Sequence, residues 1–226
     1  MSLPHAVRAV VFDMDGLLVD TETLFRDAMR AAADAMGREL PDHLHRRLIG
    51  GNLSAERAIL AEHFGPGFIL EDYHHQVRAH YDEMAGAGIV LKAGVVELLD
   101  HLDEAGLPCA IATSSSHAEV ERNLGPHGLR GRFRAAIAHG DYDRGKPHPD
   151  PFLKAAEALG VEATHCLALE DSHTGVRAAH ASGMMTVMVP DLLEPTEEMR
   201  ALCVRIVETL HEVPALIAAA NAEEQA

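Results

Sequence analysis

The sequence has no tryptophan, and aromatic residues of all kinds make up only 4% of its 226 residues. Hydrophobic residues still reach 47%, so a core of ordinary size must be built mainly from aliphatic side chains. Runs of about 18 apolar residues, the length that crosses a bilayer, are also missing. The N-terminal segment MSLPHAVRAV has no basic stretch followed by a long apolar one, which argues against a signal peptide. We therefore expect a cytoplasmic protein that does not act on a membrane.

Cysteine and positive charge are scarce as well. The three cysteines, Cys109, Cys166 and Cys203, form no CxxC pair and lie in apolar segments, so we expect reduced, buried thiols. Lysine and arginine number 19 against 35 acidic residues, which gives a net charge of −16. Nucleic acids and anionic lipids require a basic surface, so the composition excludes them as main partners. An anionic substrate would need local positive groups or a metal ion.

The second half of the sequence alternates short apolar runs with amphipathic segments. Including one run near the N-terminus, buried strands are predicted at 7–12, 108–112, 135–138, 166–169 and 185–189. Helices are predicted at 94–105, 117–124, 150–159 and 173–182. Alternating strands and helices are typical of a parallel sheet covered by helices on both faces. The predicted fold class is therefore α/β, with a Rossmann-like parallel sheet.

The segment between the first two predicted strands has a different pattern. Helices are predicted there at 21–36, 54–64 and 70–84, and no convincing strand appears between residues 21 and 90. A helical block of about 70 residues therefore looks inserted after the first strand. We expect a Rossmann-like core made of residues 1–17 and 90–226, and an all-helical domain made of residues 18–89.

Polar residues that suit phosphate chemistry follow each of the first four predicted strands. In chain order they are Asp13 and Asp15, then Thr113 and Ser114, then Lys146, and finally Glu170 and Asp171. The carboxyl ends of parallel strands lie at one edge of a sheet, so these side chains should meet there. Clustered carboxylates need a hard cation, and oxygen ligands select Mg²⁺ or Ca²⁺. The TSSS turn before a helix offers N–H groups and hydroxyls to a phosphate, and the lysine adds positive charge.

A metal site, a phosphate site and a carboxylate nucleophile together indicate phosphoryl transfer. Asp13 and Asp15 alternate along an extended segment, so both side chains lean to the same side, about 6.5–7 Å apart. We expect Asp13 to attack phosphorus and form an aspartyl-phosphate. Asp15 would protonate the leaving oxygen and later deprotonate the incoming water.

Four segments carry a family resemblance. In chain order, FDMDGLLVDTE, ATSSS, GKPHPDPF and LEDSHTGVRAA resemble the four motifs of the haloacid dehalogenase-like (HAD) hydrolase superfamily. The similarity is strongest to its beta-phosphoglucomutase-like and sugar-phosphate phosphatase branch, which has a helical cap domain after the first strand. The resemblance implies a Mg²⁺-dependent phosphatase that acts on a small phosphorylated sugar or polyol. We also expect the protein to be a monomer.

The resemblance also implies roles for individual residues. Asp13 corresponds to the phosphorylated nucleophile and a metal ligand, and Asp15 to the acid/base whose backbone carbonyl binds Mg²⁺. Asp171 corresponds to a direct metal ligand, with Glu170 beside it as a ligand or as an acid behind the ligands. The remaining three correspond to phosphate-binding positions: Thr113, Ser114 and Lys146.

The nearest alternative is a beta-phosphoglucomutase-like phosphomutase. Such enzymes resemble the first motif but carry a histidine shortly after it and an arginine in a cap loop. Phe25 and Leu53 occupy these positions here, which favours simple hydrolysis. The glycines of the same loop, Gly50 and Gly51, are expected to face the site.

Alternatives from other classes fit less well. A receiver-like signalling module also phosphorylates an aspartate beside an acid pair and a lysine, but it needs about half this length and no cap. An EF-hand calcium loop would need an oxygen ligand where Leu17 stands. A catalytically silent binding protein would not need the complete set of acids and lysine. Ser172 is interpreted as the N-cap of the following helix rather than as a nucleophile.

Overall fold

A computed structural model describes residues 3–49, 53–65, 67–86 and 88–223. The chain divides into two compact units, one made of Met1–Asp20 and Val90–Ala226 and the other of Thr21–Ile89. We call them the sheet unit and the helical unit. The first boundary falls after Asp20, where the sequence alone placed it after residue 17.

The sheet unit contains six parallel strands in the order β3-β2-β1-β4-β5-β6. Their bounds are β1 Ala9–Phe12, β2 Cys109–Ala112, β3 Ala135–Ile137, β4 Cys166–Glu170, β5 Met185–Met188 and β6 Arg205–Ile206. The first five confirm the predicted strands. The sixth has only two residues, which is too short to produce a pattern in the sequence. The predicted Rossmann-like α/β fold is confirmed.

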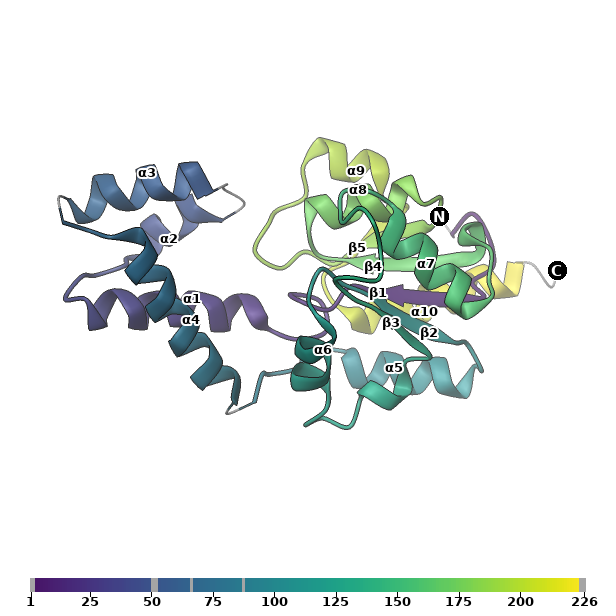
Figure 1. Cartoon of the computed structure of the whole chain (residues 1–226). Coiled ribbons are helices and arrows are strands. Elements are labelled where there is room, and N and C mark those ends of the chain that lie inside the picture. Colours follow the sequence, from purple (N-terminus) through teal and green to yellow (C-terminus); the bar gives the residue numbers. More distant parts are fainter. Residues whose placement is uncertain (1–2, 50–52, 66, 87, 224–226) are drawn as a thin grey trace. The chain divides into compact units, whose positions relative to one another are not determined.

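Helices cover both faces of the sheet, with α7 and α8 on one face and α5 on the other (Figure 1). The helices of this unit are α5 Val95–Glu104, α6 His117–Leu124, α7 Asp150–Leu159, α8 His173–Ala181, α9 Glu197–Leu202 and α10 Val213–Glu223. Small side chains of the central strands, Ala9, Val11 and Ala168, pack against Phe152 of α7 in a fully buried cluster. Because both faces are buried, the strands read as continuous apolar runs rather than alternating ones.

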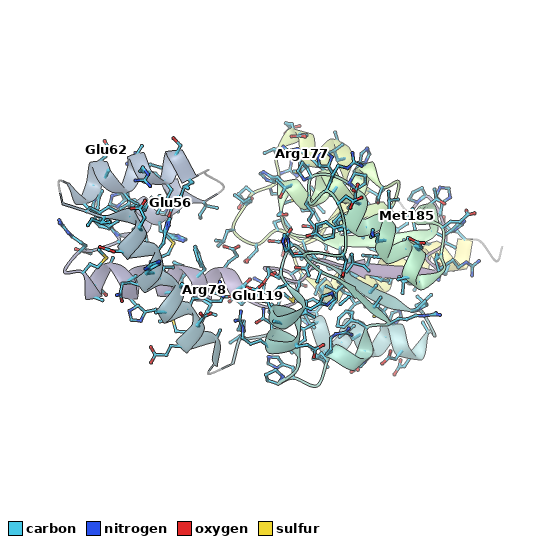
Figure 2. The ribbon with its side chains drawn as sticks, in the orientation of Figure 1. Glu56, Glu62, Arg78, Glu119, Arg177 and Met185 are labelled. Carbon is cyan, nitrogen blue, oxygen red and sulfur yellow. The ribbon has the colours of Figure 1, made fainter. Side chains whose placement is uncertain are left out.

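The helical unit consists of four helices among its described residues, which are α1 Thr21–Ala35, α2 Asp42–Leu48, α3 Leu53–Phe64 and α4 Leu70–Gly86. Its core is a separate cluster in which the fully buried Tyr73 donates a hydrogen bond to the Met29 carbonyl at 3.1 Å. The Glu56 carboxylate of α3 lies 3.0 Å from the His74 ring nitrogen of α4 and joins the two helices (Figure 2). This unit therefore has its own core, as an inserted domain requires.

The two segments that join the units are hydrogen-bonded to each other within the sheet unit. The Asp20 amide donates to the Val90 carbonyl at 2.9 Å, and the Lys92 amide donates to the Leu18 carbonyl at 3.0 Å. The chain therefore leaves and re-enters the sheet unit through two paired segments. This pairing explains why the sheet unit includes residues up to Asp20.

The sequence also predicted reduced, buried cysteines and no membrane-spanning segment. The three cysteines are free; Cys109 and Cys166 are buried, whereas Cys203 is partly exposed. Burial raises the pKa of the Cys109 and Cys166 thiols to about 12 and about 11. None of the helices in the described part of the chain combines the length and the apolar character needed to span a bilayer.

Candidate active site

The order of the strands reverses between β1 and β4, and three carboxylates lie at this switch point. Asp13 directly follows β1, and its amide donates to the Leu169 carbonyl of β4 at 3.0 Å. Glu170 ends β4 and Asp171 follows it. One carboxylate oxygen from each of the three acids lies within 4.8 Å of the others. Ligands of open parallel sheets bind at this place, outside the carboxyl ends of the strands.

Lys146 lies between two of these acids. Its Nζ donates to Asp13 Oδ1 and to Glu170 Oε1, both at 2.5 Å, and its side chain is only 6% exposed. The Nζ also lies 5.1 Å from the centre of the Phe152 ring. Burial alone would lower the pKa of this lysine, but the two carboxylates together outweigh it and raise the pKa. The lysine is therefore charged and holds the carboxylates together.

Glu170 is fully buried, and hydrogen bonds occupy both of its oxygens. Oε1 accepts from Lys146, while Oε2 accepts from the amides of Asp171 and Ser172 and from the Ser172 hydroxyl at 3.0–3.1 Å. The side chain lies directly above Gly175 of α8, where a Cβ would overlap with the carboxylate. Glu170 therefore orients the lysine and the start of α8, and a cation would have to share an oxygen with these donors.

Asp171 differs from its neighbour because one of its oxygens is unsatisfied. Oδ1 is buried and has no hydrogen-bond partner within the described part of the chain. Burial, and next the charges of Glu170 and Asp13, raise the pKa of Asp171 well above its usual value. Burial, and next the charges of Glu170 and Asp15, raise the pKa of Asp13 to about 7 in spite of Lys146. A hard cation would satisfy the orphaned oxygen and favour the ionised acids, so these residues fit Mg²⁺.

Asp15 lies outside this carboxylate group and is held by hydroxyls from the segment after β2. Ser115 Oγ donates to Asp15 Oδ2 at 2.6 Å, and Thr113 Oγ1 donates to the same oxygen at 3.3 Å. Burial raises the pKa of Asp15, although these two hydrogen bonds act in the opposite direction. A carboxyl group with a raised pKa, held in one orientation, suits proton transfer.

Sequence reasoning missed Ser115 as the partner of Asp15. The structure places the Thr113 side chain in full burial, where its hydroxyl also accepts from the Ser115 amide at 3.0 Å. Ser114 is exposed beside it, and Ser116 begins α6 with a capping box to Glu119. The TSSS segment therefore both orients the Asp15 carboxylate and caps helix α6. The sequence shows three serines in a row and does not indicate which of them binds Asp15.

The remaining sequence-based expectations have clear positions. Ser172 caps α8, because its side chain accepts from the Gly175 amide at 3.1 Å, which confirms its interpretation as an N-cap. Phe25 and Leu53 lie on α1 and α3 of the helical unit and are 47% and 59% exposed. Gly50 and Gly51 lie outside the described residues.

Comparison with known proteins identifies the family. Residues 10–189, most of the chain, match the model of the haloacid dehalogenase-like hydrolases. The chain belongs to this family. It is 38% identical over 199 residues to the plasmid-encoded protein CbbY of Cupriavidus necator, which covers 81% of this chain and 78% of that protein. The resemblance to HAD hydrolases noted in the four motifs is thereby confirmed.

Other HAD relatives carry more informative descriptions. A Thermotoga maritima protein named phosphorylated carbohydrates phosphatase is 31% identical over 178 residues, covering 79% of this chain and 82% of that protein. The solved structure of a HAD family hydrolase from Deinococcus radiodurans, with bound phosphate and sodium, has a TM-score of 0.81 and 26% identity. That alignment covers 95% of this chain and 96% of the other. The chain is therefore a HAD hydrolase with phosphatase relatives.

Proposed function

We propose that the protein is a Mg²⁺-dependent phosphatase that hydrolyses a small phosphorylated sugar or polyol through an aspartyl-phosphate on Asp13. The observation that carries the proposal is the convergence of Asp13, Glu170, Asp171 and Lys146 at the switch point of the sheet. The relative named as a phosphorylated carbohydrates phosphatase supports the substrate class. The net charge of −16 argues that a phosphate is held by these local groups rather than by the general surface field.

Asp13, Asp171 and Glu170, with the backbone carbonyl of Asp15, would hold the cation. When bound, Mg²⁺ neutralises charge on the phosphoryl oxygens and lowers repulsion between the substrate and the attacking carboxylate. Lys146 contributes a second positive charge at the same place and holds Asp13 in position through its 2.5 Å hydrogen bond. Ser114, which is exposed, would contact the phosphate, whereas Thr113 is fully buried and would act through its hydrogen bonds to Asp15 and to the Ser115 amide.

In the first half-reaction a carboxylate oxygen of Asp13 attacks phosphorus, and the bond from phosphorus to the substrate oxygen breaks. Asp15 gives its proton to that leaving oxygen, so a neutral alcohol departs. The raised pKa of Asp15 keeps the proton available for this step. Ser115 keeps the carboxyl group in place through its 2.6 Å hydrogen bond.

In the second half-reaction a water molecule attacks the phosphorus of the aspartyl-phosphate. Asp15, now ionised, takes a proton from this water, and the acyl phosphate bond breaks. Inorganic phosphate leaves, and Asp13 returns to its carboxylate form with Asp15 protonated again. The two aspartates therefore finish the cycle as they began it.

The helical unit is proposed to act as a cap that excludes water during the first half-reaction and reads the organic part of the substrate. Two of its three large exposed apolar side chains among the described residues, Phe25 and Leu53, stand at the positions aligned with the mutase residues and are the candidates for contacts with substrate carbons. We expect the protein to act as a monomer on a free small molecule.

The decisive experiment measures phosphate release from p-nitrophenyl phosphate and from a panel of sugar and polyol phosphates, with Mg²⁺ and with EDTA. We expect release only with Mg²⁺, and loss of at least about 10³-fold in kcat/KM for Asp13→Asn, because the nucleophile is removed. Arg57→Ala, which breaks an exposed ion pair of the helical unit, is the control and should retain the activity on p-nitrophenyl phosphate. Full activity in Asp13→Asn would contradict the proposal.

The same panel separates a phosphatase from a phosphomutase. A hexose 1-phosphate is followed by phosphorus NMR. We expect inorganic phosphate as the product, because Phe25 and Leu53 replace the histidine and arginine of the mutase motifs. Accumulation of the hexose 6-phosphate would instead identify a mutase.

A further inference from the structure

A fourth acidic residue, Asp191, lies beside the carboxylate group and has no role in the mechanism above. It follows β5 by three residues, in the segment Val189, Pro190 and Asp191. Its Oδ1 accepts from Lys92 Nζ at 2.7 Å, and its side chain is 14% exposed. Its Oδ2 is buried and has no hydrogen-bond partner among the residues that the structure describes.

Gly16 shows where this second oxygen points. A Cβ placed on Gly16 would collide with Asp171 Oδ2 and would lie 3.5 Å from Asp191 Oδ2. The two carboxylates therefore approach the same point above the glycine, from the ends of neighbouring strands β4 and β5. Gly16 has a φ of +82°, so its backbone also favours glycine here. The absence of a side chain lets the two acids come together.

A purely structural ion pair does not account for this arrangement. Lys92 neutralises Asp191 through one oxygen, and an exposed carboxylate would turn its other oxygen to water. Here that oxygen is buried next to Asp171, which is itself nine-tenths buried and keeps its own Oδ1 without a partner. The oxygen of Asp171 that approaches the same point is Oδ2, and Asp191 Oδ2 finds no donor there, so it is costly to bury unless a cation or an ordered water satisfies it.

Gly16, Lys92 and Pro190 also line a neighbouring cavity of about 210 Å³, whose lining includes none of the four acids. Mg²⁺ commonly keeps several of its waters and binds through only one or two carboxylates. A carboxylate behind such a water acts as an outer ligand of the metal.

We propose that Asp191, oriented by Lys92, is a positioning residue of the cation site and accepts a hydrogen bond from a water bound to the cation that Asp13 and Asp171 hold. This inference rests on the proposed function, since it presumes the Mg²⁺ site. With Asp191, the segment after β5 would also contribute a residue to the cation site. Partners behind the direct ligands typically change metal affinity by about 10–100-fold when they are removed.

The test measures the Mg²⁺ dissociation constant by isothermal titration calorimetry at pH 8, without substrate. We expect Asp191→Asn to weaken binding roughly 10-fold, and Asp191→Ser to do the same. The matched control is Glu194→Gln, which removes one negative charge from an exposed side chain of the same segment and should leave the affinity unchanged. The rise of the thermal midpoint on adding Mg²⁺ should be smaller in both Asp191 variants than in the parent protein.

Each outcome decides the question. Binding by Asp191→Asn within twofold of the parent protein would overturn the inference while leaving the phosphatase proposal intact. Equal weakening in Glu194→Gln would show a general field effect and would also overturn it. If the parent protein bound no Mg²⁺ and released no phosphate with it, the proposed function itself would fail, which is a distinguishable result.

Discussion

Both units carry ion pairs at their surface, but among the described residues only the sheet unit also buries a group of paired charges. In the sheet unit Asp13, Glu170 and Lys146 are buried together, with the lysine 2.5 Å from both acids. In the helical unit the ion pairs lie at the surface; the Arg57–Glu71 pair, at 2.6 Å, has side chains that are 56% and 64% exposed. Burying charges costs free energy unless they are paired, whereas exposed pairs contribute little either way.

This difference matches the proposed division of roles, with phosphoryl transfer in the sheet unit and substrate selection in the helical unit. In the sheet unit the buried charges cost folding free energy, but together they form a group of residues that suits phosphoryl transfer. The helical unit keeps an ordinary apolar core around Tyr73 and exposes Phe25 and Leu53. The residues proposed to read the substrate thus lie outside the unit that is proposed to carry the chemistry.

The largest expected difference in stability between the two units comes from substituting the buried lysine, Lys146→Met. Removing the lysine leaves Asp13 and Glu170 facing each other without compensation, and breaking a buried ion pair typically costs about 3–5 kcal/mol of unfolding free energy. Chemical denaturation at pH 8 measures the loss, which should shrink at pH 5 as the acids become protonated. We also expect a large loss of phosphate release. Arg57→Ala in the helical unit should change stability little, and an equal effect of the two substitutions would refute the contrast.

A smaller effect is expected from a pair of glycine substitutions. Gly175→Ala places a Cβ inside the Glu170 carboxylate, so the acid must move away from Lys146. We expect a cost of about 1–3 kcal/mol, together with reduced activity. Gly86→Ala, at the end of α4 in the helical unit, meets nothing within 4 Å and should not destabilise the protein. Thermal melts and phosphate release of both variants measure the difference; a neutral Gly175→Ala would show that Glu170 is not held against the glycine.

The smallest expected effect is on the pH dependence of folding stability, to which one acid in each unit contributes with opposite sign. Burial raises the pKa of Asp13 to about 7, so the folded state binds more protons than the unfolded chain between about pH 4 and 7. The hydrogen bond from Arg57 lowers the pKa of Glu71, so that acid contributes stability above pH 4.5, its unperturbed value, and loses it as the pH falls.

With EDTA present, we therefore expect the thermal midpoint of the metal-free protein to fall by a few degrees between pH 5 and pH 8. Added Mg²⁺ should restore it more at pH 8 than at pH 5, because the cation binds the ionised acids. Asp13→Asn should flatten this dependence. A midpoint that rises steadily with pH in the metal-free protein would contradict the raised pKa.

Much of the fold could be predicted from the sequence because the relevant patterns are local. Buried strands such as 166–169 are unbroken apolar runs, and helices such as 150–159 end at a glycine. Three of the elements that were missed, β6 with two residues, α2 with seven and α9 with six, are too short to repeat a period. The fourth, α10 with 11 residues, is apolar or alanine on most of its positions and shows no clear amphipathic pattern. Their formation depends on contacts with neighbouring segments rather than on their own pattern.

The sequence was enough to predict which residues form the candidate site, but not which hydrogen bonds join them. The rule that site residues follow parallel strands brought Asp13 and Asp171 together, and the same rule applied to the fifth strand would have indicated Asp191. Which serine of TSSS holds Asp15 depends on a contact between residues 100 positions apart. That Glu170 uses both oxygens within the protein, whereas Asp171 does not, is likewise set by the packing of α8.

The paired segments around Leu18–Asp20 and Val90–Lys92 have a consequence for how such proteins diversify. The Asp20 amide and the Val90 carbonyl are 2.9 Å apart, so the two ends of the insertion meet at one hydrogen-bonded position. A short turn could join them, and so could a helical domain of a different size or sequence, without a change in the sheet. Exchange of the inserted domain between relatives at this junction would therefore test the proposed role of the helical unit in substrate preference, and the junction is the place at which to cut in building chimeric enzymes.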